Sequence, residues 1–489
     1  MVIPFPERIS YAWATLFASV LLAVQLFQHT HVIFALCCFA FILVAVAGVN
    51  FAGGVTRPAG AYIFCNATLT LIIGLVTKAA LGEAADTNLA TPMQSILVYL
   101  LGMVSMLAAA LVEYRFRRKG SVLETFFPLR SLRTTYIGAT VLSVGSYFFF
   151  FLPPSISASG AATTFRNLNQ FLPFALIIGV LYTVRASNGR RSLTPGLALL
   201  YAFAFIIALP GYSKQGLFTP AICWVAGACL ARYRLKPINM VSLALTIYVL
   251  VAYLAPYSQF GRELVPTDSY IGNMEQSLNL LANISTVKAL EGKSEEGEYG
   301  RLNYFNQPEG LFDRLQMFSP DDALIDVTDR MGTYGYEPTK EGWENLIPHV
   351  LWPNKPVPYF GNKYAHEIGG IDDEDTTTGV SFGISADAYH QGGFVGVLVI
   401  ETLCLAAVFL VLSWLLGDVR DHPLVIISIL IISHYGPEGG IDGLILLILN
   451  AVTILILGFI CMYILPVFAS ILEPPDPAGV PPRHVLTAN

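Results

Sequence analysis

The sequence predicts an all-α polytopic membrane protein with about twelve transmembrane helices and one large, mainly helical loop. Of its 489 residues, 54% are hydrophobic and only 13% are charged, whereas soluble globular proteins carry about 25% charged residues. The apolar residues are gathered into stretches that approach the about 20 residues needed to cross a bilayer. A single long polar segment, residues 258–393, interrupts this pattern.

The apolar stretches divide the chain into three regions. Residues 1–257 form an N-terminal membrane region with about nine spans, residues 258–393 form a polar loop module, and residues 394–489 form a C-terminal membrane region with about three spans and a short tail. The candidate spans are 10–27, 31–51, 61–81, 95–114, 133–152, 170–186, 195–210, 217–232, 239–257, 394–416, 422–436 and 441–465.

The short loops between these spans predict the orientation of the chain. With the spans above, the basic clusters and both termini fall on one side, which the positive-inside rule assigns to the cytoplasm. The polar loop module then faces the periplasm, and long loops are translocated largely regardless of their charge. The clusters are Arg115, Arg117, Arg118 and Lys119; Arg130 and Arg133; Arg185, Arg190 and Arg191; and Arg232, Arg234 and Lys236.

Charge and cysteine content exclude several kinds of function. The formal net charge of −6 argues against a nucleic-acid partner, which would require a basic surface. All seven cysteines lie in apolar stretches and none in the polar module, so no disulfide framework is expected there. The spacing shows no cysteine–histidine metal pattern. We therefore expect no metal and no cofactor.

Two cations lie on the outer side of the predicted membrane, against the usual bias. Arg166 is in the outer loop before the span at 170–186, and Lys214 is in the next outer turn. Such side chains can reach up to lipid phosphates, or they can form a cationic pocket for a phosphorylated lipid. For Lys214 both interpretations stay open; for Arg166 the pocket is favoured, because outward cations are otherwise avoided.

Polar residues at membrane depth form a second set of candidates. Glu401 lies about two turns inside a predicted span, where a carboxylate is either functional or kept neutral by a neighbouring helix. The stretch from His434 to Asp442 contains glycines and a proline that break a helix, and it brings His434, Glu438 and Asp442 close together. Irregular backbone at this depth survives only inside protein or along a wet cavity. A tight turn with solvated acids is the simpler alternative.

Within the polar module, capping signals predict two short helices. One begins with Ser319 as N-cap and Pro320 at the first helical position, and it ends at Gly332. The other runs from Thr339 to Val350, before a proline. The acidic pair Asp321 and Asp322 in the first helix is expected to be solvated surface.

Two motifs in the module resemble a known family. The stretch 347–356, Ile-Pro-His-Val-Leu-Trp-Pro-Asn-Lys-Pro, is similar to the Pro-Arg-x-x-Trp-Pro-x-Lys-Pro element of Wzy-type polymerases of bacterial O-antigen and exopolysaccharide. The stretch 381–396 resembles the acidic/Ala-Tyr-x-x-x-Gly-x-x-Gly element that enters the next span in that family. The sequence differs from the family element at one position, where His349 replaces the arginine that follows the first proline. Without the resemblance, Trp352 and the prolines would simply dock the loop at the membrane interface.

The resemblance implies a metal-independent glycosyltransferase of the bacterial inner membrane. It would polymerise oligosaccharide repeat units carried on undecaprenyl pyrophosphate, in contact with membrane lipids, a chain-length regulator and a flippase. Fixed cations would stabilise the pyrophosphate leaving group, and a general base would activate the acceptor hydroxyl. The candidate cations are Arg166, Lys214, Arg314, Arg330 and Lys355. The candidate bases, in order of preference, are His349, Glu438, His434 and Asp387. The candidate sugar-binding residues are Trp352 and Tyr389.

Two other functions are kept open. A ligase would move finished glycan to another lipid, and nothing in the sequence opposes it. A flippase or transporter of lipid-linked glycan would predict repeated halves with discontinuous helices. The sequence shows no internal repeat, and a flippase has little use for a long outer module.

Overall fold

The computed structural model is built from helices, as the sequence predicts, and contains no β-strand among the residues that it describes. Those residues are 5–129, 131–147, 167–258, 270–284, 303–306, 315–347, 351–352, 355, 359–376 and 378–472. Three predicted site residues, Arg166, Arg314 and His349, lie outside them.

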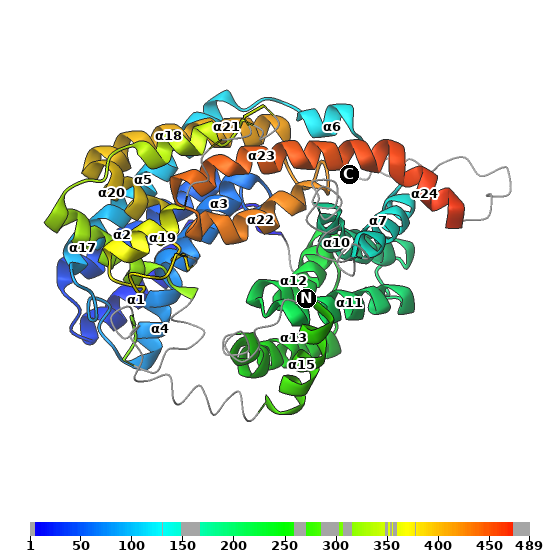
Figure 1. Ribbon diagram of the computed structural model, residues 1–489, viewed down its shortest axis with the longest axis horizontal. Helices are drawn as coiled ribbons and strands as arrows, with labels where there is room; N and C mark the ends of the chain where they lie inside the picture. Colours follow the sequence, from blue (N-terminus) through cyan, green and yellow to red (C-terminus); the bar gives the residue numbers. More distant parts are fainter. Residues whose placement is uncertain are drawn as a thin grey trace.

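The helices form two groups (Figure 1). The first group combines the N-terminal helices with those of the polar module and the C-terminal region. Its members are α1 (Tyr11–Phe27), α2 (Val32–Phe51), α3 (Pro58–Ala67), α4 (Ile73–Leu81), α5 (Pro92–Phe116), α6 (Val122–Phe126), α17 (Phe318–Met331), α18 (Glu337–Glu344), α19 (Phe360–Glu367), α20 (Ile384–Val395), α21 (Thr402–Leu415), α22 (Val425–Glu438) and α23 (Gly440–Phe459).

The second group is made mostly of the middle of the chain. Its members are α7 (Leu132–Tyr147), α10 (Phe171–Ala186), α11 (Pro195–Ala208), α12 (Lys214–Leu230), α13 (Pro237–Val249), α15 (Tyr270–Ala282) and α24 (Leu465–Leu472). Helix α23 continues through a π-helical turn into α24, which packs on α7 and so connects the two groups.

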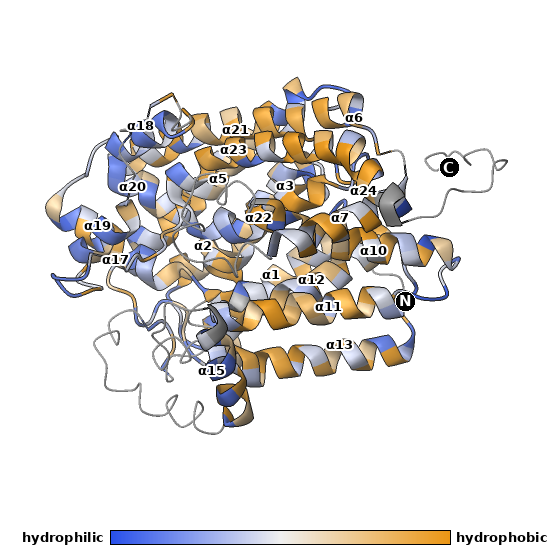
Figure 2. Cartoon of the chain, turned by 45° about the vertical axis from the view of Figure 1, so that its right-hand side comes forward, coloured by the Kyte–Doolittle hydropathy of each residue, from blue (hydrophilic) through white to orange (hydrophobic). Residues whose placement is uncertain are grey.

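Within the described residues, seven helices are long and apolar enough to cross a membrane. They begin at Val32, Pro58, Pro92, Leu168, Pro237, Ile384 and Gly440, and four shorter apolar helices accompany them. Helices form here because a chain in lipid must satisfy its backbone hydrogen bonds within the segment. Figure 2 shows the hydrophobic residues concentrated along α11, α13, α21 and α23 and the hydrophilic residues on α17–α20. The prediction of an all-α membrane protein is therefore confirmed for the described residues.

Prolines and glycines set many of the helix boundaries. Pro58, Pro92, Pro195 and Pro237 each occupy the first position of a helix, where the missing N–H has no intrahelical partner to lose. Helix α4 ends at Gly82, which adopts a positive φ of 78°.

The two helices predicted in the polar module are present, with different starts. Helix α17 begins at Phe318 and ends at Gly332, so its end is as predicted. Ser319 is not its N-cap, because the side chain of Gln316 already accepts a hydrogen bond from the Ser319 N–H at 3.1 Å. Helix α18 begins before Thr339 and ends at Glu344, so the predicted end at Val350 is also wrong. The Thr339 hydroxyl does not cap it, since it donates to Gln391 at 2.6 Å.

Candidate functional site

The helix break expected after His434 lies between α22 and α23. Helix α22 continues through Pro437 to Glu438, so the break is confined to Gly439 and Gly440. Gly440 has a positive φ of 57°, and its N–H donates to the Phe382 carbonyl at 3.2 Å. The Gly436 carbonyl, which would pair with that N–H in a continuous helix, accepts a hydrogen bond from Asn66 instead at 3.2 Å. These two hydrogen bonds hold the break in place.

Asp387 connects this break to α20. It lies in the first turn of that helix and is buried. Its Oδ2 accepts a hydrogen bond from the backbone N–H of Ile441 at 2.8 Å. Its Oδ1 accepts from the Tyr364 hydroxyl at 3.1 Å and from Gln391 at 2.9 Å. A buried carboxylate requires such donors, and together they fix its direction.

A cavity of about 240 Å³ lies at this junction. Three of the four predicted bases, Asp387, His434 and Glu438, line it, together with Asp442. His434 Nδ1 lies 3.3 Å from Glu438 Oε2, one helical turn along α22, and both side chains are partly exposed. The cavity therefore combines an accessible histidine–carboxylate pair with a buried carboxylate that is held rigidly. The remaining lining residues are Phe360, Gly361, Tyr364, Val380, Ser381, Phe382, Tyr435, Gly439, Gly440, Gly443 and Leu446.

Beside the cavity, the acidic pair of α17 is buried, so its expected place on a solvated surface is wrong. Asp321 accepts hydrogen bonds from the Tyr99 hydroxyl at 2.6 Å and the Gly383 N–H at 2.7 Å. Burial raises the pKa of Asp321 to about 7, although these two donors act in the opposite direction. Asp322 accepts from the Ser95 hydroxyl at 2.6 Å. The pair joins α17 to α5 and to the segment that enters α20.

His390, one helical turn beyond Asp387, is a buried residue that the sequence did not single out. Its ring centroid lies 4.7 Å from that of Tyr364 and 5.4 Å from that of Tyr334. Its Nδ1 lies 2.8 Å from the Thr328 hydroxyl. Its Nε2 is 3.1 Å from Glu367, outside hydrogen-bond geometry. His390 thus packs α17 and α19 against α20.

The glycines at the end of α20 allow close packing. Gly392 and Gly393 leave helical geometry and kink the chain near the end of α20. A Cβ on Gly396 would lie 2.0 Å from the Ala388 carbonyl oxygen. Beyond the kink Glu401 is fully buried; its Oε1 accepts from Ser385 at 3.1 Å, and its Oε2 has no hydrogen-bond partner among the described residues.

Of the predicted phosphate-binding cations, Lys355 and Arg330 have described side chains, and neither lines this cavity. Lys355 is buried and donates to the carbonyls of Asn345 and Ile347 at 3.0 and 2.9 Å. Arg330 pairs with Asp326 at 2.6 Å on the outer surface of α17. Lys214 is the first residue of α12, in the second helix group. The structure does not describe its side chain. The phosphate-binding roles of Lys355, Arg330 and Lys214 stay predictions, as do those of Arg166 and Arg314, which lie outside the described residues.

The predicted sugar-binding residues also lie apart from the cavity lining. The Tyr389 hydroxyl donates to Asp329 at 2.6 Å and accepts from Gln94 at 2.5 Å, so both of its hydrogen-bonding directions are in use. Trp352 is half-buried in the segment after α18, and its backbone carbonyl accepts from the Lys355 N–H at 3.2 Å.

Sequence reasoning missed Tyr364 and Gln391, which orient Asp387. Gln391 follows Asp387 by four residues, the spacing that places two side chains on one helix face, so it could have been found. Tyr364 carried no local signal. No group of three possible metal ligands occurs among the described residues. The chain has no significant match among family models, curated proteins or solved structures.

Proposed function

We propose that this protein is a glycosyltransferase of the bacterial inner membrane that polymerises oligosaccharide repeat units carried on undecaprenyl pyrophosphate. The observation that supports the proposal is the cavity that combines His434, Glu438 and Asp387 where the polar helices meet the ends of apolar ones. In this proposal about twelve helices span the membrane, the polar module is periplasmic and both termini are cytoplasmic.

The proposed reaction needs a base beside the acceptor sugar. The acceptor hydroxyl oxygen attacks the anomeric carbon of the donor glycan. The bond from that carbon to the pyrophosphate oxygen breaks, and its electron pair leaves with undecaprenyl pyrophosphate. The hydroxyl proton passes to Glu438, and His434, 3.3 Å away, orients the carboxylate. Asp387, with its three donors, positions the start of α23 beside the pair.

The pyrophosphate site in this proposal lies outside the cavity. The described residues of the cavity lining include three carboxylates and no lysine or arginine, so they would repel a pyrophosphate. Arg166, Lys214 and Arg314 remain the candidates for binding it, because fixed cations stabilise the charge that develops on the leaving group. Growing and incoming glycans would be its two substrates, with a chain-length regulator and a flippase as partners.

The test uses purified protein in detergent with synthetic undecaprenyl-pyrophosphate repeat units. Wild type is expected to yield a ladder of lipid-linked oligomers on a gel. Glu438→Gln should slow chain growth about 10²- to 10⁴-fold, the usual contribution of a general base. Glu337→Gln, an exposed carboxylate on α18, is the matched control and should keep the wild-type rate. An unaffected ladder in Glu438→Gln would exclude this carboxylate as the base.

The same assay separates the other functions. A single transfer of glycan to a different lipid would identify a ligase. No glycosidic product, combined with translocation of the lipid-linked unit across liposomes, would identify a flippase. Arg166→Ala tests the leaving-group site: loss of the ladder with unchanged folding is expected, and a wild-type ladder would remove Arg166 from that site.

A further inference from the structure

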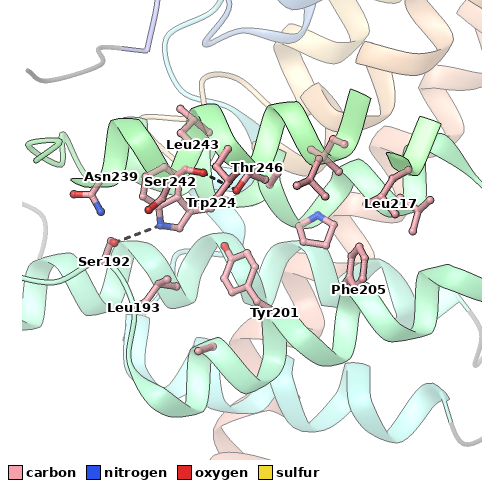
Figure 3. Close-up of a pocket in the computed structure, with 17 residues that line it drawn as sticks. Ser192, Leu193, Tyr201, Phe205, Leu217, Trp224, Asn239, Ser242, Leu243 and Thr246 are labelled. Carbon is pink, nitrogen blue, oxygen red and sulfur yellow. Dashed lines mark hydrogen bonds between the residues drawn. The ribbon is translucent and has the colours of Figure 1, made fainter. Parts of the chain in front are cut away.

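A large apolar groove lies in the second helix group, away from the candidate site. It has a volume of about 600 Å³ and is enclosed by α11, α12 and α13 (Figure 3). Tyr201, Phe205 and Trp224 form its inner wall. Helix α13 forms the opposite wall, and none of its residues is buried. Two apolar helices do not stand apart around an empty space of this size, because an unfilled cavity forfeits packing energy on every side.

The groove has a polar end and an apolar end. Ser192, Asn239 and Ser242 gather at one end, on the left of Figure 3, and Leu217 lies at the other. Ser192 accepts a hydrogen bond from the Trp224 indole at 3.4 Å. This distribution suits an amphiphile with one polar end rather than a wholly apolar molecule.

The length of the groove matches one leaflet of a bilayer. Along α13 and the turn after it, its lining runs from Asn239 to Leu254, about 22 Å at 1.5 Å per residue. One leaflet of a bilayer, with its headgroup region, is about 20–22 Å thick. The groove therefore takes an acyl chain that enters from one membrane surface and reaches the midplane.

The polar end is bordered by positive charge. Arg190 and Arg191 directly precede Ser192, and Lys236 directly precedes α13; all three are exposed. Lys236 donates to the Arg190 carbonyl at 3.2 Å, which joins the two turns. The sequence holds no aspartate or glutamate between residues 125 and 262, so no acid in this part of the chain neutralises them. A basic cluster at a membrane surface attracts anionic lipid headgroups.

We propose that this groove is a specific binding site for an anionic phospholipid of the surrounding bilayer. One acyl chain fills the space between α13 and α11–α12. The phosphate lies against Arg190, Arg191 and Lys236, and the glycerol region lies near Asn239 and Ser242. The site is independent of the proposed glycosyl transfer.

The test measures quenching of Trp224 by lipids brominated in the acyl chain, with full-length protein in phosphatidylcholine vesicles. The Trp224 signal is the difference between wild type and Trp224→Phe. Brominated phosphatidylglycerol is expected to quench it at about tenfold lower mole fraction than brominated phosphatidylcholine, because the basic cluster attracts anionic headgroups. Equal quenching by both lipids would reduce the groove to ordinary lipid contact and overturn the proposal.

Two sets of variants test the basic cluster and the volume of the groove separately. Arg190→Gln/Arg191→Gln/Lys236→Gln should abolish the preference, whereas Arg115→Gln/Arg118→Gln/Lys119→Gln, in a different basic cluster, should keep it. Ser242→Leu fills the groove and should reduce quenching by both lipids. Ala244→Leu, exposed on α13 outside the lining, should not. Equal effects of the two leucines, or displacement of the brominated lipid by stoichiometric undecaprenyl phosphate, would contradict the proposal.

Discussion

Asp387 and Ile441 are joined by a hydrogen bond of 2.8 Å between the carboxylate of one and the backbone N–H of the other. They lie 54 residues apart, at the starts of α20 and α23. The N–H groups of a first helical turn have no intrahelical acceptor, and an anion there is favoured by the helix dipole. Asp387 therefore serves as an N-terminal cap for α23 that comes from a different helix, and it fixes one side of the candidate cavity.

Gly440 makes this contact possible, and replacing it should be costly. A Cβ on Gly440 would lie 2.9 Å from Asp387 Oδ2, and the residue has a positive φ of 57°. Gly440→Ala should lower the free energy of unfolding by about 1–3 kcal/mol, measured as a loss of thermal stability in detergent. Gly443→Ala is the control, since its Cβ would meet only Tyr435 at 3.7 Å. Equal stability of the two variants would refute the role assigned to Gly440.

The buried carboxylate of Asp322 should matter far more for stability than the partly exposed carboxylate of Asp326 on the same helix. It accepts hydrogen bonds from the Ser95 hydroxyl and from two backbone N–H groups at the start of α5. Asp322→Asn should lower the free energy of unfolding by about 2–3 kcal/mol, because an amide offers one acceptor oxygen to these donors. Asp326→Asn breaks only a surface pair with Arg330, which is worth less than about 1 kcal/mol. Chemical unfolding measures the free energy of unfolding of both variants. Similar decreases in Asp322→Asn and Asp326→Asn would contradict the role assigned to Asp322.

Asp321 should make stability depend on pH. Burial raises its pKa to about 7 in the folded state, against about 3.9 in the unfolded chain. Between these values the folded state holds a proton that the unfolded state lacks, so stability falls as pH rises from about 4 to about 7, by up to about 1.4 kcal/mol per unit. Thermal unfolding of wild type and Asp321→Asn across this range should show the difference. Parallel curves for the two proteins would contradict the raised pKa.

Another buried carboxylate, Asp418, connects the segment after α21 to the segment before α3. It accepts hydrogen bonds from the Arg420 guanidinium at 2.6 and 2.9 Å and from the Thr56 hydroxyl at 3.1 Å. Asp418→Asn should lower the free energy of unfolding by about 1–3 kcal/mol, because an amide offers one acceptor oxygen to these donors and no charge to Arg420 and Arg57. Glu7→Gln removes the other, half-exposed partner of Arg420 and should change stability by less than about 1 kcal/mol. Thermal unfolding measures the stability of both variants. A loss of stability in Asp418→Asn no larger than that in Glu7→Gln would show that the Asp418 hydrogen bonds are dispensable.

Local patterns predicted part of the candidate site. His434 and Glu438 are four residues apart, and that spacing alone puts them on one helix face. Their position beside Asp387 was not predictable in the same way, because it depends on the pairing of Phe382 with Gly440 and on the Tyr364 hydroxyl, contacts between segments that no local periodicity relates. The predicted starts of α17 and α18 were wrong for a similar reason: glutamine side chains accept hydrogen bonds from backbone N–H groups, a role that the capping rules assign to serine and threonine.

The sequence by itself determined that this protein is helical and apolar, because long uncharged stretches can satisfy their backbone only as helices in lipid. It also determined where many helices begin, since proline and glycine act through their own dihedral angles. Only the tertiary structure decided which acids are exposed and which are buried. Asp321 and Asp322 look like surface residues in the sequence, yet both are enclosed, because donors from distant helices offset the loss of water around the carboxylate.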